Sequence, residues 1–343
     1  MWNDLYDMAR QQSLLGVVFY GIQKYRDIRI ERPLLLQWFS VNEQILFQNK
    51  KVDRAAVALS SFLNDRGFEA CVLKGQGNTL NYPNPYIRMS GDIDVWVRPK
   101  RVEGVRDCKV LQQIEAVISL ARTYKQDARP TYHHVDFREV NGVEVELHYR
   151  PSFMNNPVHN RRLQRWFAEQ QDVQFAHSVV LPDGAGAIQV PTHAFNRIFQ
   201  MAHISNHFFH EGIGLRQLLD YYYVLQQGFT EEEREQDEKL LRRFGLYNVA
   251  AAVMYVLQKA FGLLQEHMLV ATDEKRGRFL LNEIIQGGNF GQYDKRTKNH
   301  HSQRGRNIQR LKRDARLMWL FPSECIWEPI FRVWHYFWRL WKR

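Results

Sequence analysis

The chain has 343 residues, of which 45% are hydrophobic and 24% are charged, so its composition is that of a globular protein and excludes a disordered one. This length is enough for two or three domains, or for one domain with helical additions. The formal net charge of +10 predicts attraction to polyanions: nucleic acids, nucleotides or an anionic membrane surface.

The cysteines and the first residues indicate the cellular compartment of the protein. Cys71, Cys108 and Cys325 are odd in number and far apart, so they form neither a disulfide framework nor a paired metal motif, which favours a reducing compartment. Asp4 and Asp7 stand where a signal peptide would carry basic residues. We therefore expect a cytoplasmic protein.

The first 66 residues are expected to be helical. Apolar residues recur at a helical spacing from Leu5 to Ile22, and two further helices are expected at about 34–48 and 52–66, where Gly67 can end the last one. The run Phe68–Gly75 then changes to the short apolar character of a strand.

The next segment is predicted to contain most of the β-structure. A loop rich in Asn and Pro leads to a second strand, Asp92–Val97, which Pro99 closes. A helix is expected at about 105–124. The run Thr131–Pro151 then predicts a hairpin, because Asn141-Gly142 separates two alternating stretches and supports the primed turn that hairpins need.

The rest of the chain is predicted to be mainly helical. A helix begins near Arg161, and an interruption is expected at Leu181–Thr192. Later elements are expected at about 192–227, 231–261 and 273–285 (helices), at 286–307 (a polar, basic loop) and at the C-terminus (a basic, aromatic helix).

These elements predict an α+β fold in which a small mixed β-sheet core of about four strands is flanked by N-terminal and C-terminal helical regions. The expected boundaries are 1–66 for the N-terminal helical region, 67–155 for the core and 156–343 for the C-terminal helical region.

Two acids interrupt the apolar second strand of the core. Residues i and i+2 of a strand share a face, so Asp92 and Asp94 project together. In the second strand of the hairpin, Glu144, Glu146 and His148 share a face in the same way. If the two strands are neighbours, three carboxylates converge, and hard oxygen ligands on rigid strands suit one or two Mg²⁺ or Mn²⁺ ions. The alternative is that the aspartates lie on a solvated strand edge.

The spaced motifs resemble a known family. The segment "LKG", the run "YIRMSGDIDVWV" and the run "VEVELHYRP" look like the nucleotidyltransferases of the polymerase-beta superfamily, and more closely like an uncharacterised bacterial branch of it. Later landmarks continue the resemblance over about residues 70–330: "HISNHFFHEGIGLRQLLDYY", "GGNFG" and "LFPSE". The resemblance implies Mg²⁺-dependent transfer of an NMP group from an NTP to a hydroxyl-bearing acceptor, with release of pyrophosphate.

The resemblance also implies roles for the acids, and makes 67–155 the nucleotidyltransferase core. Asp92, Asp94 and Glu146 would be the catalytic residues and the metal ligands. Glu146 would ligate the metal near the acceptor and orient or deprotonate the attacking hydroxyl. Glu144 shares the face of Glu146, so the choice between them rests on the match to "ELHYR".

Lys74 and Gly75 are the first candidates for nucleotide binding, although the superfamily usually has Gly-Gly or Gly-Ser closer to the acidic pair. Lys74 would supply a cation to the triphosphate, and Gly75 would let the backbone approach it. The alternative for Lys74 is a strand-end lysine that extends into solvent.

Three further residues are nucleotide-binding candidates with structural alternatives. Arg88 would clamp a phosphate, or pair with Asp92. Ser90 would donate a hydrogen bond to a phosphate, or turn the loop. His148 would support the metal site or stack on a base, or simply bond a neighbouring strand.

A helix carries three histidines on one face. His203, His207 and His210 are spaced i, i+4 and i+7, which allows a Zn²⁺ site, contact with the nucleotide, or histidines satisfied within the core. The sequence does not decide among these.

The resemblance implies an NTP and an unknown acceptor as partners. The positive charge favours an anionic acceptor, and the candidates are RNA, protein or a small metabolite. The basic segment Lys295–Arg313 would grip such an acceptor, or form a solvated loop. The C-terminal "IFRVWHYFWRLWKR" helix would make a peripheral membrane contact, or pack on the protein. The alternative function is a catalytically silent nucleotide- or RNA-binding module with the same fold.

Overall fold

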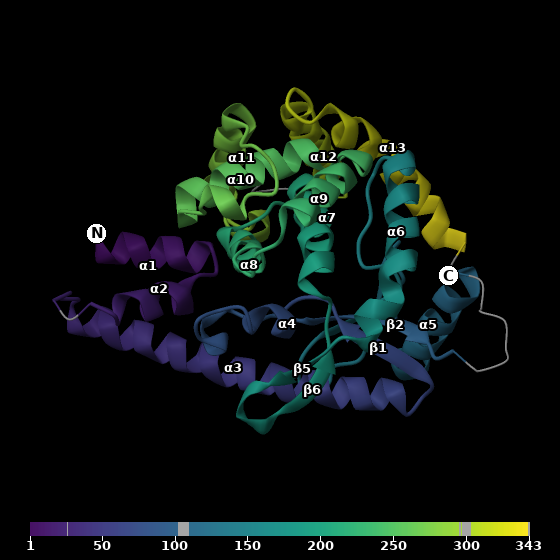
Figure 1. Cartoon of the computed structure of the whole chain (residues 1–343), viewed down its shortest axis with the longest axis horizontal. Coiled ribbons are helices and arrows are strands. Elements are labelled where there is room, and N and C mark those ends of the chain that lie inside the picture. The colour runs from purple at the N-terminus through teal and green to yellow at the C-terminus, as the bar shows by residue number, and fades with distance from the viewer. Residues whose placement is uncertain (26, 102–109, 295, 297–302, 342–343) are drawn as a thin grey trace. The chain divides into compact units, whose positions relative to one another are not determined.

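The computed structural model describes residues 1–25, 27–101, 110–294, 296 and 303–341. The chain divides into two compact units that alternate along the sequence (Figure 1). We call them the sheet unit, which comprises 15–151, 167–192 and 338–343, and the helical unit, which comprises 1–14, 152–166 and 193–337.

The sheet unit begins with helices α2 (Leu15–Ile22) and α3 (Arg32–Asn64). The prediction of two helices at 34–48 and 52–66 is wrong, because α3 is one continuous helix of 33 residues. Neither Gly nor Pro interrupts it, and a buried face continues at helical spacing across the expected gap: Ile45, Asn49, Val52 and Ala56. Gly67, at φ +78°, follows the end of the helix as predicted.

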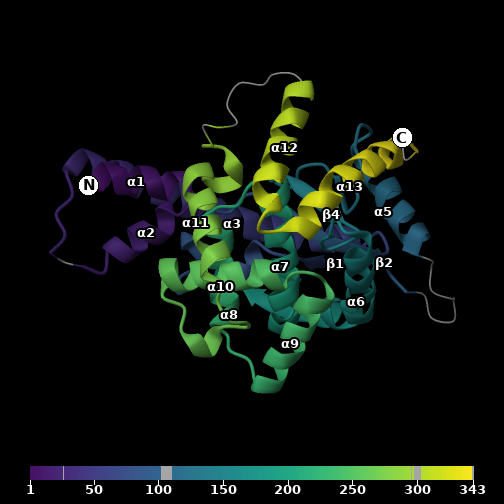
Figure 2. The same cartoon turned by 90° about the horizontal axis from the view of Figure 1, so that it is seen from above.

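The predicted small mixed sheet is present, so the α+β fold class is confirmed. Its strands are β1 (Phe68–Val72), β2 (Ile93–Pro99), β3 (His134–Asp136) and β4 (Val145–His148), in the order β1-β2-β4-β3. Figure 2 labels β1, β2 and β4. β1 pairs antiparallel with β2, β2 parallel with β4, and β4 antiparallel with β3. Two helices complete this part: the short α4 (Gln76–Thr79) and α5 (Val110–Tyr124). The predicted residues 105–109 of the latter lie outside the described residues.

The two faces of the sheet differ. Ile93, Val95 and Val97 of β2, with Val145 and Leu147 of β4, enter an apolar core that α3 and α5 also line. The residues between them necessarily face the other way, because side chains of a strand alternate. The predicted acids of β2 and β4 therefore share the face turned away from this core.

The hairpin of β3 and β4 confirms the predicted primed turn. Asn141 and Gly142 both have positive φ, 51° and 68°, as a type I′ turn requires. Val140 and Val143 exchange backbone hydrogen bonds of 3.0 Å around it. The hairpin sets His134 opposite His148, and Asp136 opposite Glu146.

The predicted interruption at Leu181–Thr192 is in fact part of a second hairpin. Strands β5 (Ser178–Leu181) and β6 (Gly186–Gln189) pair antiparallel around a tight turn, in which Asp183 has φ +54°. The Pro- and Gly-rich turn dominates the local sequence, so it hid the two short strands that flank it.

The helical unit holds the remaining helices: α1 (Trp2–Gln11), the first part of α6 (Pro157–Ala176), α7 (His193–His210), α8 (Leu215–Leu225), α9 (Glu231–Arg243), α10 (Tyr247–Phe261), α11 (Glu274–Gly287), α12 (Gln303–Met318) and most of α13 (Pro322–Trp341). Two predicted helices are wrong as single elements. That at 192–227 breaks after His210, and that at 231–261 breaks at Gly245, which has φ +72°. Moreover, α12 begins inside the predicted loop 286–307.

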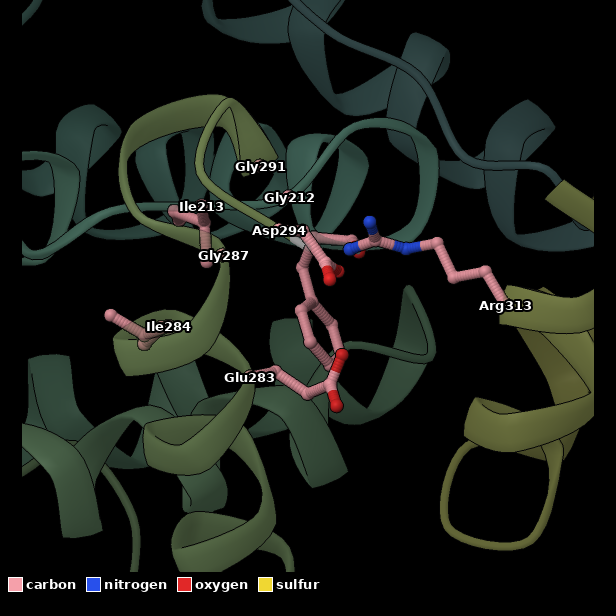
Figure 3. A pocket seen from close by; sticks show the side chains of 9 residues that line it. Gly212, Ile213, Glu283, Ile284, Gly287, Gly291, Asp294 and Arg313 are labelled. Carbon is pink, nitrogen blue, oxygen red and sulfur yellow. The ribbon is translucent and has the colours of Figure 1, made fainter. Parts of the chain in front are cut away.

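Glycines bring two distant turns of the helical unit together (Figure 3). A Cβ on Gly212, in the α7–α8 turn, would lie 2.9 Å from the backbone nitrogen of Gly291. A Cβ on Gly291, which follows α11, would lie 2.4 Å from the carbonyl oxygen of Glu211. The sequence landmarks "HEGIG" and "GGNFG" are thus explained by one close backbone contact. Phe321 of the third landmark, "LFPSE", packs on Phe208 and Phe209 near the end of α7.

We expect Gly291→Ala to destabilise the protein more than Gly262→Ala. Both glycines have left-handed φ, +66° and +68°, so alanine costs about 1–2 kcal/mol of backbone strain at either position. Only Gly291 adds a steric overlap, since nothing lies within 4 Å of a Cβ on Gly262. Thermal unfolding should show a melting temperature lower for Gly291→Ala than for Gly262→Ala by at least about 2 °C. Equal melting temperatures would contradict the contact.

Candidate active site

Asp94 lies at the centre of a group of charged side chains on the sheet face turned away from the core. We call this group the carboxylate–histidine cluster, and its members are Lys74, Asp92, Asp94, His134, Glu146 and His148. Asp94 is buried, with 4% of its surface exposed, and each carboxylate oxygen has a partner. Oδ2 lies 2.9 Å from Nζ of Lys74, and Oδ1 lies 2.9 Å from Nε2 of His148. A buried carboxylate is tolerated only when it is paired in this way, so Lys74 and His148 are what allow Asp94 to occupy the strand.

Glu146 is the register partner of Asp94 across the parallel pair β2–β4. Its Oε2 lies 3.3 Å from Nε2 of His148 and 3.3 Å from Nδ1 of His134. Burial alone would raise the pKa of Glu146, but the hydrogen bond with His148 and the nearby imidazoles outweigh burial and lower this pKa. Glu144, in contrast, is exposed and lies in none of the metal-type groups found among the described residues. The geometry thus separates the two glutamates that the sequence left together.

Asp92 directly precedes β2, and its side chain is exposed. The pKa of Asp92 is raised, first by the negative charge of Asp94 and then by desolvation, with Lys74 acting in the opposite direction. The two aspartates are therefore close enough to repel one another. A cation between them and Glu146 would relieve that repulsion.

Lys74 follows β1 and carries a positive charge into the cluster. Burial opposes this charge, but the carboxylates of Asp94 and Asp92 outweigh burial and raise the pKa of Lys74. Gly75 has φ +62° and precedes α4, a conformation that favours glycine. The structure therefore places Lys74 beside the acids and Gly75 at the turn next to them.

His148 is the most enclosed member of the cluster, with 3% exposed. Desolvation would lower its pKa, but hydrogen bonds to Asp94 and Glu146 raise the pKa of His148 to about 9. Its other ring nitrogen, Nδ1, is buried, and no described residue forms a hydrogen bond with it.

Arg88 and Ser90 lie in the loop before β2, where α3 holds them. Nδ2 of Asn49 donates to the carbonyl oxygens of Arg88 at 2.8 Å and of Tyr86 at 3.2 Å. Oγ of Ser90 lies 2.6 Å from Oδ1 of Asn49 and 3.0 Å from Oε1 of Gln76. The Arg88 side chain is buried, with Nη1 3.5 Å from Oγ of Ser90. A phosphate would have to compete with these contacts, and both phosphate-binding roles stay predictions.

The sequence interpretation missed the residues of β3 that complete the cluster. His134 and Asp136 share the face of Glu146 and His148, and Nε2 of His133 lies 3.1 Å from Nδ1 of His134. Burial lowers the pKa of His134, against the opposing charge of Glu146. The signal was available: "HVD" lies opposite "ELH" once the Asn-Gly turn fixes the hairpin register.

The three histidines of α7 do not form a metal-type group in the part of the chain that the structure describes. His207 lies 3.3 Å from Glu211, and its ring packs edge-on against His203 at 4.3 Å between centroids. Nδ1 of His210 lies 2.8 Å from the carbonyl oxygen of Asn206. These contacts favour a structural role for this face.

A small pocket belongs to the helical unit, and its charged groups have partners (Figure 3). Glu283 accepts from Arg296 and Arg316, and Arg313 donates to the carbonyl oxygens of Phe208 and Glu211. These bonds tie α7, α11 and α12 together. The lining residues are Phe208, Gly212, Ile213, Glu283, Ile284, Gly287, Gly291, Asp294 and Arg313.

Comparisons with known proteins address the identity of this chain. Residues 1–264 match the profile of a protein family described as "Uncharacterised nucleotidyltransferase". The chain belongs to this family. It is a nucleotidyltransferase, and the matched range includes the whole carboxylate–histidine cluster.

The other comparisons add little. No curated protein sequence matches the chain. A solved structure titled "Crystal structure of an antigenic nucleotidyltransferase-like protein from Paracoccidioides brasiliensis" is 13% identical, with a TM-score of 0.37, over 66% of this chain and 97% of that one. A likeness at this level does not bear on the site.

The loop that precedes the acids should depend on Asn49. We expect Asn49→Ala to lower the free energy of unfolding by about 1–3 kcal/mol, because it removes the donor to the buried carbonyl oxygen of Arg88 and to the partly buried one of Tyr86. Gln44→Ala, on an exposed turn of the same helix, is the matched control. Urea unfolding of the two variants checks this, and an equal effect would contradict the anchoring role.

Proposed function

We propose that this nucleotidyltransferase, of polymerase-beta type, moves an NMP group from an NTP to a hydroxyl-bearing acceptor and releases pyrophosphate. One observation carries the proposal: in a member of this family, Asp94 and Glu146 are register partners on two parallel strands. Strands hold side chains more precisely than loops, as a site for phosphoryl-type transfer needs.

The residues present fit a divalent cation. Ligand atoms of Asp94, Glu146 and His148 lie within 4.8 Å of one another, and Asp92 repels Asp94 from beside it. Carboxylate oxygens are the ligands that Mg²⁺ and Mn²⁺ prefer. Asp92, Asp94 and Glu146 would hold the ion, which would supply positive charge to the phosphate oxygens during displacement.

The side chains have distinct tasks in this proposal. Glu146 stays ionised at neutral pH, because its pKa is lowered, so it can accept the hydrogen bond of the acceptor hydroxyl and orient it. The hydroxyl oxygen forms a bond to the α-phosphorus as the bond from that phosphorus to the bridging oxygen breaks, and the hydroxyl proton moves toward Glu146. Lys74 remains protonated and attracts the triphosphate, while Gly75, Arg88 and Ser90 would line its path.

The acceptor is proposed to be anionic, in keeping with the net charge of +10. RNA, protein and small metabolites are the candidate classes. Of the basic segment Lys295–Arg313, residues 295 and 297–302 lie outside the described residues, and α12 covers the remainder from Gln303 onward. A grip by this segment stays a prediction.

We expect Asp94→Asn to abolish transfer and Glu146→Gln to reduce it by at least about a hundredfold, because each removes a negative charge from the proposed cation site. The measurement is transfer of label from α-labelled NTP, with Mg²⁺ or Mn²⁺, to RNA, protein and small-molecule fractions of a host lysate. Glu144→Gln, directly before β4 and outside the cluster, is the matched control and should keep wild-type activity.

Each result has a distinct meaning. Label in one fraction, lost in Asp94→Asn and kept in Glu144→Gln, would support the proposal and name the acceptor class. Tight NTP binding without metal and without pyrophosphate release would instead favour the catalytically silent module. Equal loss in Glu144→Gln and Glu146→Gln would contradict the assignment of Glu146.

We also propose a peripheral contact of α13 with an anionic membrane. An apolar stripe at helical spacing is 50–63% exposed: Ile326, Ile330, Val333 and Phe337. Arg310 and Lys312 of α12 are exposed cations on the preceding helix, which complements anionic lipid. None of the described helices combines the length and apolarity that crossing a bilayer requires.

The double variant Ile330→Asp/Phe337→Asp should lose binding to vesicles that contain an anionic lipid, since it charges the apolar stripe. Vesicle co-sedimentation measures this, with Val180→Asp, at an exposed apolar position on β5, as control. Wild-type binding by the double variant, or equal binding to neutral vesicles, would rule out the contact.

A further inference from the structure

Three imidazoles gather beside the carboxylates of the sheet unit. The ring centroids of His133 and His134 are 4.4 Å apart. The ring centroid of His148 lies 5.2 Å from that of His133 and 5.1 Å from that of His134. One ligand nitrogen of each ring lies within 4.8 Å of the other two. The hairpin register creates this group, since His134 stands opposite His148.

The two ring nitrogens of His148 differ in their bonding, as they do in a histidine that binds a metal. Its Nε2 lies 2.9 Å from Asp94 and 3.3 Å from Glu146, while its Nδ1 is buried and has no hydrogen-bond partner among the residues that the structure describes. A histidine that binds a metal through one nitrogen usually donates its other N–H to a carboxylate, which fixes the ring. A buried polar atom without a partner, in turn, calls for an explanation.

We propose that His133, His134 and His148 bind a transition-metal ion of the Zn²⁺ type, with Nδ1 of His148 as one ligand. Imidazole nitrogens suit Zn²⁺ and Co²⁺, whereas Mg²⁺ takes oxygen ligands, so this site is chemically distinct from the carboxylates. Three histidines leave an open fourth position on a tetrahedral ion. His148 links the two sites, because the same ring contacts Asp94 and Glu146.

The inference deepens the proposed function, since the bound ion would fix His148 and thereby orient the carboxylates of the cation site. It rests on that function only for this consequence. Binding itself needs neither nucleotide nor acceptor, and can be measured without them.

The test is titration of the metal-free full-length protein with Co²⁺, read by its visible absorption, and with Zn²⁺, read by calorimetry, both in excess Mg²⁺. We expect one site per chain and the intense absorption of tetrahedral Co²⁺. His133→Ala and His134→Ala should each weaken Zn²⁺ binding by at least about tenfold. His267→Ala, which removes a histidine outside this cluster, is the matched control and should bind as the wild type does.

The two hypotheses can fail separately. Asp92→Asn should lose nucleotide transfer but retain Zn²⁺ binding, because Asp92 contributes no ligand to the histidine site. Circular dichroism checks that each variant is folded. If one of the two histidine variants does not fold, the other still tests the site. Absence of tetrahedral Co²⁺ in the wild type, or wild-type affinity in both histidine variants, would overturn the inference and leave the proposed function untouched.

Discussion

The arrangement of the candidate site depends on the burial of one carboxylate, that of Asp94. A charge on a residue that is only 4% exposed is stable only if its oxygens are paired, and the partners come from two other elements. Lys74 reaches it from the end of β1, and His148 reaches it from β4. Removing either partner would leave a buried charge uncompensated, at a cost of about 3–5 kcal/mol. The pairing therefore holds β1, β2 and β4 in one register, and the same register assembles the site.

One face of the sheet packs in the apolar core, and the other face carries the side chains of the candidate site. Val95 and Leu147 lie in the apolar core, while their neighbours Asp94 and Glu146 lie on the opposite face. A shift of β4 by one residue along β2 would turn Glu146 toward the apolar core and move Val145 and Leu147 out of it. The hydrophobic core thus specifies the position of the carboxylates as firmly as their own ion pairs do.

Local rules explain what the sequence could predict. The alternation around Asp94 and Glu146 and the Asn141-Gly142 turn each depend on a few neighbouring residues, and all were confirmed as structure. The parallel pairing of β2 with β4 joins segments that are distant in the sequence. The sequence therefore predicted that the carboxylates converge only if these two strands are neighbours. His134 and Asp136 were missed because they gain meaning only opposite Glu146 and His148. The close approach of Gly212 and Gly291 was equally out of reach, since it links two turns far apart in the chain.

Charge arithmetic within the cluster gives a reason for a cation that does not depend on family resemblance. Three carboxylates, those of Asp92, Asp94 and Glu146, face two groups whose pKa values are raised, Lys74 and His148. Before any metal ion binds, both of these are protonated at neutral pH, and the five groups still carry a net negative charge. A triphosphate is itself strongly negative, so it would be repelled from this place unless further positive charge entered with it. A divalent ion is the smallest addition that reverses the sign, and the carboxylate oxygens are the ligands it prefers.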